Sequence, residues 1–329
     1  MSWGGADDPP IGFSSLRRIG QASHATCRGD GTGLMPNSPP AALASWIAAR
    51  LPTWALLGLY RLGPVTRLLR SMLNRSVPHG ITEVTVAAGQ LAGARLLLDL
   101  REEKDLWLGS YEPFMLEAVA RFTRPGMTAY DVGAHIGYVT VCLAQAVGPQ
   151  GHVVAFEPLP GNQQRLRANL ELNGLSGRVR VVAGAVGEIA GRQRFRPHSS
   201  VAMGRLAAQE APDEPAAGLL EVEVVTLDEF AAAAGAPPDL IKMDIEGGEA
   251  AALRGARRLL RQAKPILLLE MHEAHEAEAG SVVDALQQIG YEIRRLVRHY
   301  PVVASTAGLG RKAHLLALPS GGIPVPEAP

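Results

Sequence analysis

The segment 130–137, which reads YDVGAHIG, constrains the fold more than any other part of the chain. Here an apolar run ends in Asp131 and passes directly into a turn that contains Gly133 and Gly137. Glycine permits tight turns and a close approach of backbone to a ligand, and the Asp131 carboxylate can accept hydrogen bonds from that ligand. The pattern therefore predicts a strand, a turn and a helix that together bind a nucleoside-bearing cofactor. Because glycine turns of this kind also occur without a ligand, the segment alone leaves both interpretations open.

A second apolar run, HVVAFEP at 152–158, follows about one helix later and ends in Glu157. In parallel nucleotide-binding sheets, an acidic residue about 20 residues beyond the glycine turn contacts the ribose hydroxyls. The spacing predicts this role for Glu157. The alternative is that Glu157 only caps the helix expected from Pro160.

The third informative segment, LIKMDIEGGE at 240–249, places acidic residues after another buried strand. Ligands of open α/β sheets bind outside the carboxyl ends of the strands, near the point where the strand order reverses. Asp244 and Glu246 are therefore candidates for the reacting site, whereas the helix dipole alone would explain Glu249. The following strand ends in His272, whose imidazole has a suitable pKa to take a proton from an alcohol. A solvated loop histidine is the alternative.

Two further interpretations concern charge at this edge of the sheet. Lys242 lies on the same strand face as Asp244, so the two side chains are expected to form a neutralising pair. The carboxylates would also suit Mg²⁺, which prefers oxygen ligands. No spacing in the sequence requires an ion, and no metal site is predicted.

Seven segments in chain order resemble the FkbM family of S-adenosylmethionine-dependent methyltransferases. They are YDVGAHIG, AFEP, LNG (172–174), AVGE (185–188), VTLDEF (225–230), IKMDIEGGE and LLLEMH (267–272). The resemblance covers about residues 109–272, and the joint occurrence of the segments is far more specific than any one of them. Family members usually have asparagine where this chain has His135.

The resemblance implies an α/β fold with a Rossmann-like, seven-stranded, mostly parallel sheet, helices on both faces, and S-adenosyl-L-methionine as cofactor. It implies that Asp244 and Glu246 face the reacting methyl and the acceptor, and His272, from its position after the next strand, completes the predicted catalytic set. The implied cofactor-binding residues are Glu112, Asp131, Gly133, Ala134, His135, Gly137, Glu157, Pro158, Ala185 and Val186.

The rest of the chain alternates between short apolar runs and helical periodicity, which is typical of a mostly parallel sheet covered on both faces. A small hairpin is expected within 81–100, and a second hairpin has its later arm at 221–225. Single helices are expected over 111–122, 160–173, 228–234, 248–260 and 282–289, and strands over 179–183, 291–296 and 314–318. We predict a catalytic domain over 79–320 and a tail over 321–329.

The N-terminal part differs in composition from the predicted domain. Residues 1–40 are rich in Gly, Pro, Ser and Ala and are expected to be disordered. The stretch 41–78 is expected to be a helical extension, and 41–75 carries five arginines without an acidic residue, together with Trp46 and Trp54. A basic amphipathic helix with tryptophan would suit peripheral contact with an anionic membrane, whereas packing on the domain or on a second subunit is the alternative.

Charge and cysteine content limit the partners. Lys plus Arg and Asp plus Glu both total 32, so a nucleic-acid partner is not expected. The two cysteines, Cys27 and Cys142, provide neither a disulfide framework nor a zinc cluster, and a cytoplasmic location is expected. The sequence has no apolar run of membrane-spanning length and does not begin with a basic region followed by an apolar core, so neither a membrane span nor secretion is expected.

The sequence thus predicts O-methylation of a sugar, glycan or polyketide-type hydroxyl, with His272 or Asp244 as the base. A nicotinamide-dependent oxidoreductase is the first alternative, although the order GxGxxG is missing. The second is an inactive protein that still binds S-adenosylmethionine, which the many ionisable groups at one sheet edge argue against. Acceptor specificity is expected to lie in the N-terminal extension, in the segment 198–218 and in the C-terminal loops.

Overall fold

A computed structural model of the chain describes residues 46–47, 50, 77–197, 204–206, 219–272, 276–303, 309 and 312–321. The chain divides into the units Met1–Thr32 and Gly33–Pro329, and every described residue belongs to the second unit. The predicted tail over 1–40, most of the helical extension over 41–78, nearly all of the segment 198–218 and nearly all of the tail over 321–329 lie outside the described residues. Those interpretations and the domain bounds stay predictions.

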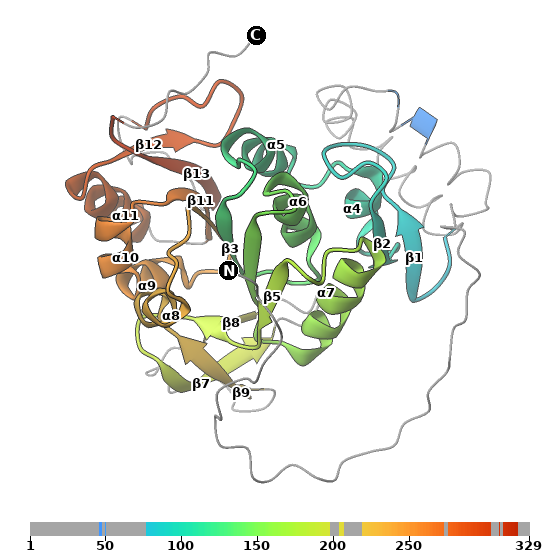
Figure 1. The fold of residues 1–329 in the computed structure, drawn as a ribbon, viewed down its shortest axis with the longest axis horizontal. Helices are drawn as coiled ribbons and strands as arrows, with labels where there is room; N and C mark the ends of the chain where they lie inside the picture. The colour runs from blue at the N-terminus through green and yellow to red at the C-terminus, as the bar shows by residue number, and fades with distance from the viewer. Residues whose placement is uncertain are drawn as a thin grey trace. The chain divides into compact units, whose positions relative to one another are not determined.

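The central feature is a seven-stranded sheet in the order β12-β13-β11-β10-β3-β4-β5 (Figure 1). Its strands are β3 (Thr128–Val132), β4 (His152–Phe156), β5 (Val179–Val182), β10 (Leu240–Met243), β11 (Ile266–His272), β12 (Tyr291–Arg295) and β13 (Lys312–Pro319). All neighbours pair in parallel except β13, which runs antiparallel to both β11 and β12. The predicted mostly parallel, seven-stranded sheet is confirmed.

The strands are buried on both faces, and successive residues alternate between two apolar cores. Ala129 and Leu240 belong to one core, which is shared with the helices α4 (Lys104–Leu108), α5 (Pro113–Phe122), α6 (Tyr138–Ala146) and α7 (Pro160–Leu172). Tyr130 and Ile241 belong to the opposite core. That core is shared with the helices α8 (Leu227–Ala234), α9 (Glu249–Arg254), α10 (Arg257–Gln262) and α11 (Glu276–Gln288), which Figure 1 shows together on one side of the sheet.

One helix prediction is wrong, because the single helix expected over 248–260 is divided into α9 and α10. A side chain at Gly255 would place its Cβ 2.1 Å from the carbonyl oxygen of Gly187, so only glycine fits at the division. The Gly255 carbonyl accepts a hydrogen bond from the backbone N–H of Asp228. The Asp228 carboxylate in turn accepts from the N–H groups of Arg258 and Leu259 and caps α10.

Two smaller sheets accompany the central one. β1 (Ile81–Thr85) and β2 (Arg95–Asp99) form the antiparallel hairpin that was predicted within 81–100. A four-stranded sheet has the order β6-β9-β7-β8, with the strands β6 (Ala185–Val186), β7 (Gly191–Pro197), β8 (Gly204–Leu206) and β9 (Leu220–Val225). β9, the predicted later arm of the second hairpin, pairs antiparallel with β7, but β8 lies between the two strands in the chain and also pairs with β7.

The strand order determines where a ligand can bind. From β3 the chain adds β4 and β5 on one side, then returns to place β10 on the other side, so the order reverses between β3 and β10. Asp131 of β3 pairs in register with Lys242 of β10 at this point. The carboxyl ends of β3, β4 and β10 therefore surround the crevice where open α/β sheets bind ligands.

Candidate functional site

The turn after β3 is shaped by close backbone packing. Gly133 has φ +82°, and a Cβ there would lie 1.8 Å from the carbonyl oxygen of Asp244, so no larger residue fits. The N–H groups of Gly133 and Ala134 donate to the carbonyl of Phe156. Gly137, with φ +91°, precedes the first residue of α6. The turn at Gly133 thus brings the ends of β3, β4 and β10 into contact.

Glu157 follows β4 and is 5% exposed. Its Oε2 accepts from the N–H of His135 at 2.8 Å, and its Oε1 accepts from the N–H of Leu159 at 2.9 Å and the Nδ2 of Asn162 at 3.1 Å. Burial raises the pKa of this carboxyl, while the hydrogen bonds oppose the shift. A carboxylate has about four acceptor positions, so at least one stays available at the pocket wall.

Asp131 lies beneath the turn and is fully buried. Its Oδ2 accepts from the hydroxyl of Thr140 at 2.6 Å, and its Oδ1 lies 3.4 Å from the Nζ of Lys242. The same ammonium donates to the carbonyl of Gly133 at 3.1 Å and lies 3.6 Å from Asp244 Oδ2. Burial alone would lower the pKa of Lys242, but the carboxylates of Asp131 and Asp244 outweigh it and raise this pKa. The expected neutralising pair is therefore a buried cation between two carboxylates.

An open pocket lies above this charge cluster, between the carboxyl ends of β3, β4 and β10 and the small sheet. Eight of the predicted site residues line it: Gly133, His135, Glu157, Pro158, Ala185, Val186, Asp244 and Glu246. The predicted residues Glu112, Asp131, Ala134, Gly137 and His272 are not among the residues that line it. Their predicted contacts with cofactor or acceptor stay predictions, and Asp131 instead supports the turn from below.

The loop after β10 places Asp244 and Glu246 at the pocket. Glu249, which is 1% exposed, accepts through Oε1 from the N–H groups of Ile245 at 3.2 Å and Gly247 at 3.3 Å. Glu246 has φ 55°, a left-handed conformation that a non-glycine residue adopts only when its surroundings impose it. Glu249 therefore does more than stabilise a helix end, because it holds the loop that carries both acidic residues.

His272, at the end of β11, lies among carboxylates. Its Nδ1 is 3.2 Å from Glu249 Oε1 and 3.7 Å from Asp244 Oδ1, and its Nε2 is 2.9 Å from Glu270 Oε1 and 3.6 Å from Glu246 Oε2. Burial alone would lower its pKa, but the hydrogen bonds to Glu249 and Glu270 outweigh it and raise the pKa of His272 to about 10. Both ring nitrogens are thus engaged, and His272 is no solvated loop histidine.

Asp244 has the opposite character. It lines the pocket, and its side chain is 18% exposed. Burial raises its pKa, although the cations of Lys242 and His272 oppose the shift. A carboxylate with a raised pKa that reaches a pocket is a better proton acceptor than an ordinary one.

Sequence reasoning missed several pocket residues. Tyr111 and Asn162 are polar residues of the wall, and Phe156, Leu159, Gly184, Phe195, Ile245 and Gly248 are the others. Asn162 had a readable signal, because it lies in the first turn of the helix after Glu157 and can reach back to that carboxylate. Phe195 had none, since it belongs to a strand of the separate small sheet.

Among the described residues, no helix combines the length and the apolar character that crossing a membrane requires.

Comparison with known proteins bears on this arrangement. Residues 131–293 match the profile of the methyltransferase FkbM domain. A protein-L-isoaspartate O-methyltransferase 1 of Arabidopsis thaliana is 32% identical over 101 residues, which is 30% of this chain and 44% of the relative. A catechol O-methyltransferase of Mycobacterium tuberculosis is 41% identical over 54 residues, which is 16% of this chain and 24% of the relative. The chain thus spans less than half the length of these curated relatives.

The structure of a methyltransferase FkbM from Methylobacillus flagellatus KT is 22% identical, with a TM-score of 0.42, over 67% of this chain and 53% of that chain. A fibrillarin from Aeropyrum pernix with natively bound S-adenosyl-L-methionine is 14% identical, with a TM-score of 0.37, over 61% of this chain and 73% of that chain.

Proposed function

The chain belongs to the FkbM methyltransferase family, and from this premise we propose that it transfers a methyl group from S-adenosyl-L-methionine to a hydroxyl of a sugar, glycan or polyketide-type small molecule. One observation carries the proposal. The pocket has the glycine turn and Glu157 on one side and the loop with Asp244 and Glu246 on the other. A methyl donor held by the first side would present its reactive group to the second.

The residues present fit the cofactor. Glu157 has an acceptor position available for a ribose hydroxyl, in keeping with its place at the end of β4. Leu159, Ala185 and Phe195 share a small apolar core and also line the pocket, which suits an adenine ring. Gly133 lines the pocket, and because glycine has no side chain its backbone can approach the ligand.

The bound cofactor supplies a sulfonium methyl that is already electrophilic, so the protein has two tasks. It must orient the acceptor oxygen toward the methyl, and it must receive the hydroxyl proton. Asp244 is favoured as the base because it reaches the pocket and burial raises its pKa. His272 is disfavoured because both of its nitrogens already face carboxylates. It is better placed to hold Asp244 and Glu246 in position.

Two substitutions test the base. Asp244→Asn should lower turnover about 10²- to 10⁴-fold under saturating cofactor, the usual range for a general base. His272→Gln should cost less, because it removes a positioning contact and not the base. If Asp244→Asn keeps wild-type turnover while His272→Gln loses it, the assignment is reversed. If both keep it, neither residue is the base.

Calorimetric titration distinguishes the enzyme classes before an acceptor is known. Binding of S-adenosylhomocysteine without binding of NAD supports a methyltransferase, and the reverse result supports the oxidoreductase alternative. A deletion strain should then contain a metabolite or glycan lighter by one CH₂, visible by mass spectrometry. Cofactor binding without any such loss would support the inactive binding protein.

The location and the membrane contact belong to the same proposal. A cytoplasmic enzyme with a small-molecule or glycan acceptor agrees with the balanced charge and the two cysteines. Contact of 41–75 with anionic lipid is tested by co-sedimentation of the full chain with anionic liposomes at low salt. Failure to sediment removes the membrane contact and leaves the methyltransferase unaffected.

A further inference from the structure

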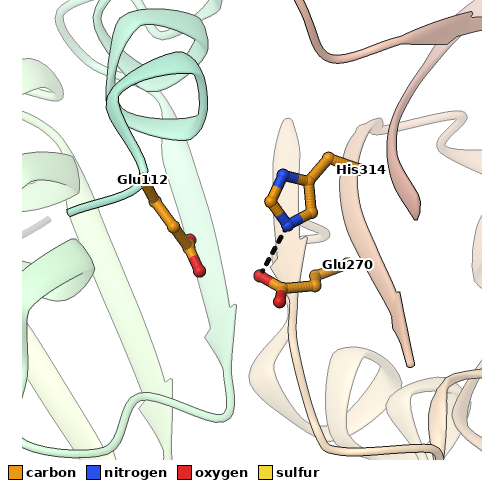
Figure 2. Close-up of side chains that lie close together, drawn as sticks. All are labelled: Glu112, Glu270 and His314. Atoms are coloured by element: carbon orange, nitrogen blue, oxygen red, sulfur yellow. Dashed lines mark ion pairs between the residues drawn. The ribbon is translucent and has the colours of Figure 1, made fainter. Parts of the chain in front are cut away.

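Behind the pocket, three side chains from separate elements converge: Glu112 precedes α5, Glu270 lies on β11, and His314 lies on β13. One ligand atom of each lies within 4.8 Å of the others. Figure 2 shows the Glu112 carboxylate extending toward the paired Glu270 and His314. We propose that these three residues hold a divalent transition-metal ion such as Zn²⁺ or Mn²⁺.

The hydrogen bonding of Glu112, Glu270 and His314 indicates that the cluster lacks a positively charged partner. Glu112 Oε2 is buried without a hydrogen-bond partner. Glu270 Oε2 and His314 Nε2 are also buried, and they lie 3.2 Å from each other. Buried polar atoms are usually paired, and Glu270 is only 1% exposed, so the Glu112 oxygen is the atom of this cluster that is left to satisfy. A single cation would satisfy this oxygen and bind all three residues.

The separation of two of these atoms fits a shared ion. Glu270 Oε2 and His314 Nε2 are 3.2 Å apart. Two ligands that each lie about 2.1 Å from one ion, at roughly tetrahedral or octahedral angles, are about 3.0–3.4 Å apart. The pair therefore already has the spacing of neighbouring ligands.

The other carboxylate oxygen of Glu270, Oε1, is held by side chains outside the proposed metal site. Its Oε1 is 2.9 Å from His272 Nε2 and also contacts the ammonium of Lys312. Carboxylates that bind metals are usually fixed in this way by further hydrogen bonds. The two oxygens of Glu270 thus divide their roles, since Oε1 is fixed by cations and Oε2 faces His314.

The donor set indicates the class of ion. One imidazole and two carboxylates suit Zn²⁺, Mn²⁺ or Fe²⁺, whereas Mg²⁺ prefers oxygen ligands and water. The alternative occupant is a proton shared between the two glutamates, because burial and the carboxylate of Glu270 raise the pKa of Glu112 to about 8. A proton shared by the glutamates would leave the contact of His314 Nε2 with Glu270 Oε2 unchanged, whereas an ion would bind His314 as well, so His314→Gln separates the two occupants.

The position of this site connects it with the pocket. Glu112 adjoins Tyr111, which lines the pocket wall. An ion bound to Glu112, Glu270 and His314 would join the start of α5 to β11 and β13. Loss of the ion should therefore loosen this wall without removing a pocket-lining residue.

The test uses the full chain, freed of affinity tags and treated with chelator. Titration with Mn²⁺ or Zn²⁺ alone, followed by calorimetry and by metal analysis after gel filtration, should give about one ion per chain. The variants Glu112→Gln and His314→Gln should weaken binding at least tenfold. Glu117→Gln on the exposed face of α5 and His299→Gln on an exposed turn are the matched controls, and both should bind as the wild type does.

Circular dichroism and a cooperative thermal unfolding transition verify that each variant is folded, and Glu112→Gln decides the test if His314→Gln does not fold. The proposal is overturned if the wild type binds no ion, or if Glu112→Gln binds it as tightly as Glu117→Gln does. If the wild type binds no ion and Glu112→Gln melts at a higher temperature than the wild type, the two glutamates share a proton instead. None of these measurements uses turnover, so their outcome is independent of the proposed methyl transfer.

Discussion

The two sides of the pocket satisfy their carboxylates in different ways. On the side of β4, Glu157 accepts from backbone N–H groups that lie within 22 residues of it in the chain. On the side of β10 and β11, Asp244 and Glu270 face the cations Lys242, His272 and Lys312. The first arrangement is made by local chain geometry. The second depends on side chains brought together from distant strands.

This difference indicates which side tolerates change. Backbone donors keep their positions when a neighbouring side chain is replaced, so the side of β4 should fail only when the turn itself is altered. A network of buried charges fails when any single member loses its partner, because the remaining charge is left without compensation. Four substitutions test this contrast, from the largest expected effect to the smallest.

Gly133→Ala should have the largest effect, because its Cβ would meet the carbonyl oxygen of Asp244 at 1.8 Å. We expect a loss of unfolding free energy beyond about 4 kcal/mol, measured by urea denaturation, together with loss of S-adenosylhomocysteine binding. Gly126→Ala is the matched control, since Gly126 also has positive φ but no atom lies within 4 Å of its Cβ position. Equal effects of the two substitutions would mean that conformation alone, and not the close contact, explains the glycine.

Lys242→Met should follow, because it leaves the buried Asp131 and Asp244 without their shared cation. Removing one partner of a buried ion pair costs about 3–5 kcal/mol, which urea denaturation would detect. Lys264→Met on the surface should change stability by less than about 0.5 kcal/mol. A Lys242→Met protein as stable as this control would show that the carboxylates need no counter-charge.

Glu157→Gln should cost about 1–3 kcal/mol of unfolding free energy, because an amide nitrogen would then face the N–H of either His135 or Leu159. Cofactor affinity should also fall, and calorimetry with S-adenosylhomocysteine would measure it.

The effect of Glu157→Gln should depend on pH, because burial raises the pKa of Glu157 above its usual 4.5. The folded protein therefore takes up a proton before the unfolded chain does as the pH falls. Protonated Glu157 therefore adds to the free energy of unfolding below pH 4.5. This contribution declines as the pH rises through the window from 4.5 to the raised pKa and is lost above it. The affinity advantage of the wild type over Glu157→Gln should disappear below that window. An advantage that persists unchanged in acid would contradict the role of the ionised carboxylate.

His135→Asn should have the smallest effect. His135 has φ 50°, a left-handed conformation that asparagine adopts readily, and its contact with Glu157 is made by the backbone. Stability should change by less than about 0.5 kcal/mol, and affinity for S-adenosylhomocysteine by less than threefold. A larger loss would assign a ligand contact to the imidazole.

The contrast between the two sides also explains what the sequence could predict. Gly133 and Glu157 belong to short segments whose spacing reflects a strand, a turn and a strand, and both line the pocket as expected. The central sheet was predicted for the same reason, because its strands are apolar runs separated by amphipathic helices. The division between α9 and α10 was missed, since it depends on Gly187 approaching Gly255 from a distant turn.

The polar group behind the pocket could not be predicted from local patterns. His314 and Lys312 lie more than 40 residues beyond Glu270, and nothing in their own segment distinguishes them from surface residues of an edge strand. Only the antiparallel pairing of β13 with β11, which sets Glu270 opposite His314 and His272 opposite Lys312, brings these side chains together.

The place of β13 also has a consequence for how the chain assembles during synthesis. The strands β3, β4, β5, β10 and β11 can join the sheet in the order in which they emerge from the ribosome, apart from the return to β10. β12 emerges before β13, yet it touches the sheet only through β13, so it has no partner strand until β13 has inserted between it and β11. The side of β4 can therefore form early, whereas the side of β10 and β11 is completed only when β13 has been made.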